Sequence, residues 1–202
     1  MASNTEIANM ALSDLGNGKE IANLENEKSA EASVMRRFYT PALETTQRDF
    51  PWPFTTKFAT LALVEEDPTT EWAFSYRYPS DCLKLRRILS GTRNDTRASR
   101  TPYKIGSDEQ GILIYTDQPD AEIEYTKRET DEGRFPADFT LAFAHRLAMY
   151  AAPRICGEDP FKMGEKAARL YFFEIATAKA TSVNEQQDEE EPDASSIQAR
   201  NA

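Results

Sequence analysis

An alternating pattern of aromatic and small or polar residues marks the middle of the chain. Trp72, Phe74, Tyr76 and Tyr78 are spaced two apart within the segment WAFSYRYPSDCL. Because successive side chains of a strand point to opposite faces, an extended strand places all four rings on one face. Aromatic residues have a high strand propensity, and the proline, serine and aspartate that follow favour a turn. The pattern predicts a half-buried strand whose aromatic face forms the core of a small sheet.

Similar alternation predicts further strands on both sides of this one. The expected strands cover residues 58–64, 72–78, 83–89, 103–105, 112–116 and 121–127. Residues 108–111 and 117–120 have the Asp, Gly and Pro content of turns. We expect these two turns to join the last three strands into a meander.

Apolar residues at helical spacing characterise the first part of the chain. Ser3 and Glu6 have the spacing of a capping box, which predicts the start of a helix. A second helix is expected over residues 29–49. Pro41 lies inside it and removes a backbone hydrogen bond, so we expect a kink or a break near residues 38–40.

Two more helices are expected in the last third of the chain. Pro136 suits the first position of a third helix, and Pro160 suits the first position of a fourth, which extends past Val183. The apolar stripe of the third helix consists of Phe139, Phe143, Leu147 and Tyr150. The stripe of the fourth consists of Met163, Ala167, Leu170, Phe173 and Ala180. Both stripes are expected to face a core.

The elements follow the order helix, helix, sheet, helix, helix. The predicted fold class is α+β: an antiparallel helical bundle with a small antiparallel β-domain inserted between its second and third helices. The bundle comprises residues 1–54 and 131–183, the β-insertion residues 55–130, and an acidic extended C-terminal arm residues 184–202. The expected core residues are Trp52, Trp72, Phe74, Tyr76, Tyr78, Phe139, Phe143 and Leu147.

The composition of the chain argues against several classes of function. The chain has 202 residues, 40% of them hydrophobic, which is enough for a domain with a buried core. Its formal net charge of −10 argues against a protein that coats nucleic acid, since phosphate binding needs a basic face. No apolar run approaches the about 20 residues that cross a bilayer, and no secretory signal is visible. Cys82 and Cys156 are expected to be reduced and buried, with a single disulfide as the alternative.

The sequence contains none of the common catalytic or ligand-binding motifs. The Rossmann, P-loop, nucleophile-elbow, zincin and EF-hand patterns are all absent. His145 is the only histidine, and we interpret it as a packed or interfacial residue of the third helix. Adjacent carboxylates such as Glu65 and Glu66 diverge into solvent instead of flanking a substrate. We therefore expect a protein that is not an enzyme and that uses no cofactor or metal.

Two charged segments are candidates for partner contacts. Residues 84–104 are strongly basic in an otherwise acidic chain, and residues 184–202 are acidic and poor in apolar residues. The first could contact an acidic partner or DNA phosphate, and the second could order on binding. The plain alternatives are a solvated loop and a tail that aids solubility. The candidate contact residues are Arg86, Arg93, Arg97, Arg100, Lys104, Asp188, Glu189, Glu190, Ile197 and Arg200.

Several segments together resemble a known family. The segments ALSDLG, RDFPWPF, WAFSYRYPSDCLKLRRI, GILIYTD, AEIEYTKR and FPADFTLAFAHRLAMYAAPRI are similar, in matching order, to the tail tubular protein A family of phage head-to-tail adaptors. The similarity spans nearly the whole chain, and the aromatic run ending in YPSDCL is its most specific part. Pro53 and Phe54, and the pair Ser195 and Ser196, depart from the family pattern, which affects local contacts there.

The resemblance implies a structural virion protein at the head–tail junction, made in the host cytoplasm. Adaptors of this family form a homo-oligomeric ring, of about twelve copies, between the portal protein and the tail nozzle, which resembles tubular protein B. The ring extends the channel through which double-stranded DNA passes without sequence-specific binding. The family has no catalytic activity and no membrane contact, so genome retention and ejection are its implied roles.

Two other classes remain as alternatives. A head-completion or stopper protein of a long-tailed phage shares the helical adaptor plan, usually in a shorter chain with fewer strands. A monomeric host-directed binding protein is a different class that the charged segments also permit. A nuclease or hydrolase is opposed by the single histidine and by the lack of clustered carboxylates.

Overall fold

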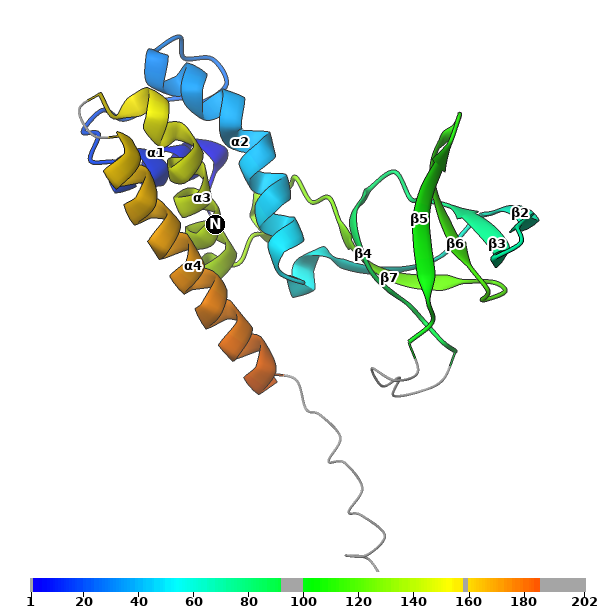
Figure 1. Ribbon diagram of the computed structural model, residues 1–202. Coiled ribbons are helices and arrows are strands. Elements are labelled where there is room, and N and C mark those ends of the chain that lie inside the picture. The colour runs from blue at the N-terminus through cyan, green and yellow to red at the C-terminus, as the bar shows by residue number, and fades with distance from the viewer. Residues whose placement is uncertain (1, 92–99, 158–159, 186–202) are drawn as a thin grey trace, which may run out of the picture.

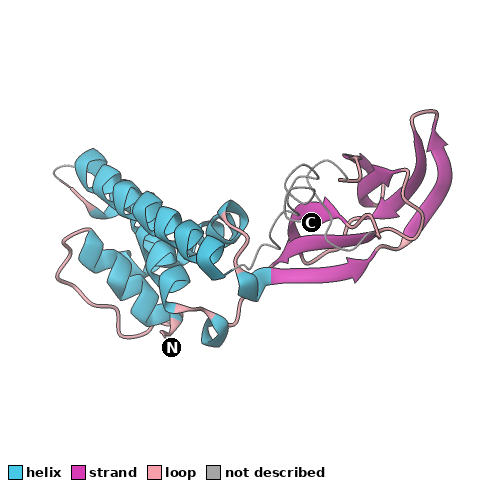
Figure 2. Cartoon of the chain, turned by 90° about the horizontal axis from the view of Figure 1, so that it is seen from below, coloured by secondary structure: helices cyan, strands magenta, loops and turns pink. Residues whose placement is uncertain are grey.

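The computed structural model describes residues 2–91, 100–157 and 160–185 (Figure 1). The helices of these residues are α1 (Asn4–Asp14), α2 (Ala30–Asp49), α3 (Ala137–Ile155) and α4 (Pro160–Glu185), with short 3-10 turns η1 (Pro53–Thr55) and η3 (Glu132–Arg134). The strands are β1 (Thr56–Thr60), β2 (Leu63–Thr69), β3 (Trp72–Arg77), β4 (Cys82–Ile88), β5 (Tyr103–Asp108), β6 (Gly111–Thr116) and β7 (Glu122–Lys127). Helices α1 to α4, here called the helical part, gather at one end, and the strands, the sheet part, at the other (Figure 2).

Side-chain caps fix where the first two helices begin. The Ser3 hydroxyl accepts a hydrogen bond from the Glu6 amide, and the Glu6 carboxylate accepts one from the Ser3 amide, which confirms the predicted capping box. Ser29 caps α2 in the same way through the amide of Ala32. Gly16, with φ at +71°, follows the end of α1 in a left-handed conformation that glycine adopts without strain.

Helix α2 runs without interruption through Pro41, so of the kink or break expected near residues 38–40 the break is wrong. Proline deprives the carbonyl of Arg37, one turn earlier, of its helical partner. Arg37 and Pro41 both lie on the exposed side of α2, where water can bond to that carbonyl. The lost hydrogen bond is therefore at a position open to water.

The core of the helical part is built around α3, which contacts α1, α2 and α4. Its buried alanines, among them Ala148 and Ala152, let the neighbouring helices approach closely. An aromatic cluster closes the end of this core next to the sheets, with edge-to-face ring contacts. Its members are Trp52, Phe54, Phe135, Phe139 and Phe143.

The seven strands form two antiparallel sheets. One sheet has the strand order β1-β7-β4, and the other has the order β2-β3-β6-β5. Leu61 and Ala62 carry the chain from the first sheet to the second, with the Leu61 amide bonded to Ala121 and the Ala62 carbonyl bonded to Arg77. A second hydrophobic core, which includes Tyr76, Ile114 and Ile123, lies between the sheets.

The predicted fold class is wrong. The described residues form four helices and seven strands, about 45% helix and 26% strand, which is a strand-rich mixed α/β structure and not a helical bundle with a small inserted β-domain. Two features of the sequence conceal how much of the chain forms strands. Residues 58–64, expected as one strand, are divided between β1 and β2, and β2 carries charged residues that hide its strand character.

The predicted meander is only partly present. Strands β5 and β6 pair as a hairpin around the turn at residues 108–111. Strand β7 follows β6 in the chain but does not pair with it. It pairs with β1 and β4 in the other sheet, so the turn at residues 117–120 joins the two sheets. Ile123 and Tyr125 of β7 are buried in the second core in this arrangement.

Candidate assembly surfaces

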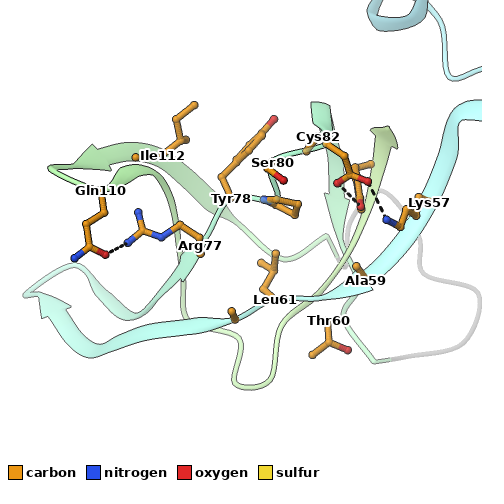
Figure 3. Close-up of a pocket in the computed structure, with 15 residues that line it drawn as sticks. Lys57, Ala59, Thr60, Leu61, Arg77, Tyr78, Ser80, Cys82, Gln110 and Ile112 are labelled. Carbon is orange, nitrogen blue, oxygen red and sulfur yellow. Dashed lines mark hydrogen bonds and ion pairs between the residues drawn. The ribbon is translucent and has the colours of Figure 1, made fainter. Parts of the chain in front are cut away.

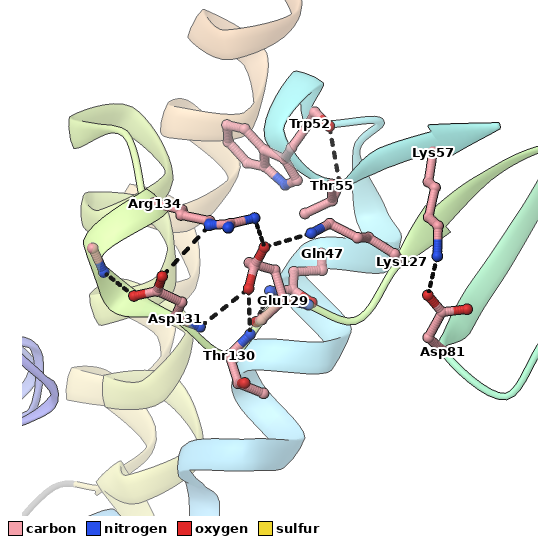
Figure 4. Close-up of polar contacts among 11 residues, drawn as sticks. Gln47, Trp52, Thr55, Lys57, Asp81, Lys127, Glu129, Thr130, Asp131 and Arg134 are labelled. Carbon is pink, nitrogen blue, oxygen red and sulfur yellow. Dashed lines mark hydrogen bonds and ion pairs between the residues drawn. The ribbon is translucent and has the colours of Figure 1, made fainter.

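The joint between the helical part and the sheet part is a buried polar contact (Figure 4). The Glu129 carboxylate, on a side chain only 9% exposed, lies 2.6 Å from Lys127 Nζ and 3.2 Å from Arg134 Nη1. It also accepts hydrogen bonds from the backbone amides of Thr130 and Asp131. Burial raises the pKa of this carboxyl, but the Lys127 ammonium and the Asp131 amide outweigh burial, and the net pKa is lowered. The joint is thus built to hold a charged carboxylate.

A second group at the same joint links α2 with β4. Lys84 Nζ and Arg86 Nη2 each lie 3.3 Å from the carbonyl oxygen of Arg48, in the last turn of α2. Arg86 is half-buried, and its Nε donates to the Thr126 hydroxyl at 2.8 Å. Arg86, a predicted partner-contact residue, therefore has a structural role inside the molecule as well.

The described residues of the predicted basic segment lie on two different sheets. Arg86 lies on β4 in the first sheet, whereas the exposed Lys104 lies on β5 in the second sheet, 3.8 Å from Glu71. Arg100 is exposed in the chain that enters β5. Arg93 and Arg97 lie outside the described residues, as do all the contact candidates of the C-terminal arm. These are Asp188, Glu189, Glu190, Ile197 and Arg200.

The predicted core residues fall into three environments. Trp52, Phe139, Phe143 and Leu147 are buried in the helical core, and Trp52 Nε1 donates to the Thr46 carbonyl. Tyr76 is buried in the second core, while Phe74 and Tyr78 pack partly buried against it. Trp72 is half-buried at the start of β3.

Helix α4 presents two aromatic side chains to solvent. Phe172 and Phe173 are 65% and 67% exposed, the largest exposed fractions among the big apolar side chains of the described residues. Tyr171 fixes their direction because it points inward: it is 1% exposed and its hydroxyl donates to Asp49 at 2.7 Å. Arg146 also binds Asp49, and its guanidinium stacks 3.9 Å from the centre of the Tyr171 ring.

This placement corrects the predicted face of the fourth helix. The stripe expected in the core included Leu170 and Phe173, but the side chains that α4 buries are those of Ala167, Tyr171, Ile175 and Ala178. Phe173 and Leu170 instead line an open pocket of about 680 Å³ on the outside of α4, together with Met163 and charged residues. The rest of its lining is Lys162, Glu165, Lys166 and Arg169.

The sheet part carries its own exposed apolar side chains. Phe58 on β1 is 52% exposed, and Ile105 on β5 and Ile112 on β6 are close to half exposed. Leu63 and Val64 on the edge strand β2 are also exposed. The molecule therefore has exposed apolar side chains on both of its parts.

A groove of about 720 Å³ separates β1 from the turn between β3 and β4 (Figure 3). Lys57 Nζ lies 2.9 Å from Asp81 Oδ2, and the Tyr125 hydroxyl donates to Asp81 Oδ1. The hydrogen bond that the Lys57 ammonium donates to Asp81 raises the pKa of Lys57, so Lys57 stays charged, and burial raises the pKa of the Cys82 thiol. At neutral pH these groups are suited to hydrogen bonding and ion pairing and not to nucleophilic attack.

Other side chains that could take part in chemistry, such as His145, have partners within the chain. His145 Nδ1 lies 2.6 Å from Asp14 Oδ2, so the single histidine ties α3 to the end of α1. Cys82 and Cys156 form no disulfide and lie in different parts of the molecule. Within the described residues, no three His, Cys, Asp or Glu side chains converge in a way that could hold a metal ion.

The chain matches no model of a known protein family and none of the curated proteins. Among the helices of the described segments, none combines the length and the apolar character that crossing a bilayer requires.

Local sequence patterns indicate the exposed aromatic pair only in part. Tyr171, Phe172 and Phe173 are consecutive, and three large rings in a row cannot all face one core from a helix. That rule shows that part of the run is exposed. It does not show which part, because the choice depends on the Asp49 and Arg146 partners of Tyr171.

Proposed function

We propose that this chain is a structural subunit of a ring, the head-to-tail adaptor that joins the portal of a tailed phage to the tail nozzle. The observation that carries the proposal is the exposed pair Phe172 and Phe173 on α4, held outward by the buried Tyr171. The resemblance of the sequence to the tail tubular protein A family supports the same role.

The surface chemistry fits a subunit that repeats around a ring. Exposed aromatic side chains are costly in water and are enriched at protein interfaces. One face on α4 and a separate apolar surface on the sheets suit a heterologous contact, in which each copy offers different faces to its two sides. A closed rotation then gives a ring instead of an open filament.

The charge of the chain fits a channel for DNA. Each copy carries a formal net charge of −10, so a ring of copies is strongly acidic. Phosphate is repelled by a wall of this sign, and DNA can then slide through without sequence-specific binding. In this role the protein performs no reaction and needs no cofactor.

The test is assembly on purified portal rings, imaged by negative-stain electron microscopy. The unaltered chain should add a ring to the portal, and the double variant Phe172→Ser with Phe173→Ser should not. The matched control is Leu141→Ser, which changes a 40% exposed apolar residue on α3. Circular dichroism and thermal unfolding of each monomer show whether the fold is retained.

Two outcomes refute the proposal. The first is a portal that stays bare when mixed with the unaltered chain. The second is a double variant that assembles as well as the Leu141→Ser control, which would show that the α4 face does not join subunits.

A further inference from the structure

The outer side of α4 combines cations with an aromatic side chain. Four residues, spaced four, three and four apart, share the side of the helix opposite to the buried Ala167 and Tyr171. All four line the open pocket of about 680 Å³ on α4. They are Lys162, Lys166, Arg169 and Phe173, and together they are called the α4 face.

The α4 face is positively charged on a chain whose net charge is −10. Its three cations have one carboxylate beside them, Glu165, which lies 2.6 Å from Arg169 Nη2. Lys166 is exposed and forms no ion pair with another described residue. Phe173, at one end of the row of cations, is 67% exposed. A surface that fits this face therefore has apolar side chains next to carboxylates.

Strand β2, at the edge of the second sheet, has that composition. Leu63 and Val64 are 49% and 43% exposed, and three exposed acids, Glu65, Glu66 and Asp67, follow directly. None of the three acids forms an ion pair with another described residue. The pairing register of β2 shifts twice, and an irregular, charged edge is a poor template for a further strand. Side chains, and not backbone groups, are therefore what β2 offers to a partner.

The two surfaces match in length and in order. From Lys166 to Phe173 a helix rises about 10 Å, and from Leu63 to Glu66 a strand extends about 10 Å. Along α4 the cations precede the phenylalanine, whereas along β2 the apolar pair precedes the acids. With helix and strand antiparallel, Phe173 meets Leu63 while Lys166 meets Glu66.

Within one copy these surfaces do not meet, because α4 and β2 lie at opposite ends of the molecule (Figure 1). We infer that the α4 face docks on the β2 edge of a second copy of this chain, with Phe173 against the apolar pair and the cations against residues 65–67. Each copy then offers α4 to one neighbour and β2 to the other, which is a heterologous contact. The inference rests on the proposed function, in which copies join head to tail, and names the two surfaces that join.

Charge reversal on each surface tests the contact. The helix variant is Lys166→Glu with Arg169→Glu, and the strand variant is Glu65→Lys with Glu66→Lys. Each should lower the fraction of portals that carry a ring about tenfold or more, because like charges then face each other. The chain with all four changes has complementary surfaces again and should recover most of the rings. Circular dichroism shows whether each variant is folded.

Matched controls change the same number of charges elsewhere. Lys28→Glu with Arg37→Glu reverses two exposed cations near and on α2, and Glu109→Lys with Glu122→Lys reverses two exposed acids of the sheet part. Both control variants should form rings as the unaltered chain does. A loss of rings in the controls equal to that in the helix and strand variants would overturn the inference, since net charge alone would then explain the loss.

A second readout uses the unaltered chain. A carbodiimide joins a carboxylate and an amine that are in contact, and mixing ¹⁵N-labelled with unlabelled protein identifies links between chains by mass spectrometry. Lys166 should be linked to Glu65 or Glu66 of another copy severalfold more often than the exposed Lys28 is. The links are measured on portal-bound rings and on the concentrated free chain. They should weaken in about 0.5 M salt, where exposed charges are screened.

The outcomes separate this contact from the adaptor role. A bare portal together with Lys166 links between free copies supports the contact and refutes the adaptor role. Rings that form equally well with either reversed variant, or a folded four-change chain that recovers none, overturn the contact and leave the adaptor role intact. Lys166 links no more frequent than those of Lys28 also overturn the contact, and this result decides alone if a reversed variant does not fold.

Discussion

Gln47 and Glu129 are 82 residues apart, and the side-chain amide of the first binds both backbone groups of the second. Gln47 Nε2 donates to the Glu129 carbonyl at 2.7 Å, and Gln47 Oε1 accepts from the Glu129 amide at 3.3 Å. The Gln47 side chain is fully buried, and its amide supplies the hydrogen bonds that the Glu129 backbone would otherwise make to a neighbouring strand or to water. The Gln47 side chain of α2 thereby holds the backbone that follows β7 in place.

The first prediction concerns this pair. Gln47→Ala leaves a buried amide and a buried carbonyl of Glu129 without partners, so the free energy of unfolding should fall by about 1–3 kcal/mol. Urea unfolding followed by circular dichroism measures the change. The control is Gln110→Ala in the exposed β5–β6 turn, expected to stay within about 0.5 kcal/mol. An equal, small effect of both variants would mean that water replaces the Gln47 amide.

The second prediction concerns the Glu129 carboxylate. Its pKa in the folded state lies below its ordinary value of 4.5, despite burial, because of Lys127 and the Asp131 amide. The charged form therefore stabilises the fold above pH 4.5, and this stabilisation is lost as the pH falls through the lowered folded-state pKa. Glu129→Gln should cost about 1–3 kcal/mol at pH 7, and the difference from the unaltered chain should shrink below pH 4.5.

Urea unfolding at several pH values between about 7 and 3 tests this prediction. Glu122→Gln is the matched control, because Glu122 is an exposed glutamate on the same strand, β7. Its effect should be small and nearly constant with pH. A Glu129→Gln deficit that does not change with pH would contradict the assigned role of the charge.

Helix boundaries could be predicted from the sequence because their causes are local. The caps Ser3 and Ser29 lie within three residues of the amides that they bind. Pro136 precedes α3 directly. Such contacts form within one turn of the chain, so sequence spacing alone identifies them.

The sheets could not be predicted in the same way, because their causes are distant. Strand β2 contains Glu65, Glu66 and Asp67, which give no apolar alternation, and it is a strand because β3 pairs with it. Whether β7 pairs with β6 or with β1 depends on contacts between segments far apart in the chain. Strand propensity depends on such neighbours more than helix propensity does.

The candidate surface on α4 was missed for a related reason. A stripe through Leu170 and Phe173 and a stripe through Tyr171 and Ile175 both have helical spacing. Burial of Tyr171 depends on Asp49, 122 residues away, so no local signal decides between the two faces. The contact candidates of residues 92–99 and 186–202 lie outside the described residues.

The third prediction separates the two faces of α4. Tyr171→Ala removes a side chain that is 1% exposed, together with the hydroxyl that donates to Asp49 and the ring that stacks on Arg146, so the free energy of unfolding should fall by about 3–5 kcal/mol. Phe173→Ala, two residues later at 67% exposure, should change it by less than about 0.5 kcal/mol. Both are measured at a concentration at which the chain is monomeric. If Phe173→Ala lowered the free energy of unfolding more than Tyr171→Ala did, Phe173 and not Tyr171 would face the core.

The fourth prediction concerns Gly106 on β5 and Tyr115 on β6. A Cβ added at Gly106 would lie 2.7 Å from Cε2 of Tyr115, so the tyrosine ring covers the glycine across the hairpin. Gly106→Ala should therefore destabilise the fold by about 1 kcal/mol, because the ring must move away. In a Tyr115→Ala background the clash is absent, and the same change should stabilise the strand by about 0.5–1 kcal/mol.

A double-mutant cycle measured by urea unfolding tests this change of sign. Gly18→Ala is the control, since a Cβ at Gly18 meets no atom within 4 Å and should have the same small effect in both backgrounds. An effect of Gly106→Ala that is identical with and without the Tyr115 ring would show that the ring does not cover the glycine. Loss of stability in both backgrounds would instead point to the backbone of β5, an edge strand, as the source of the cost.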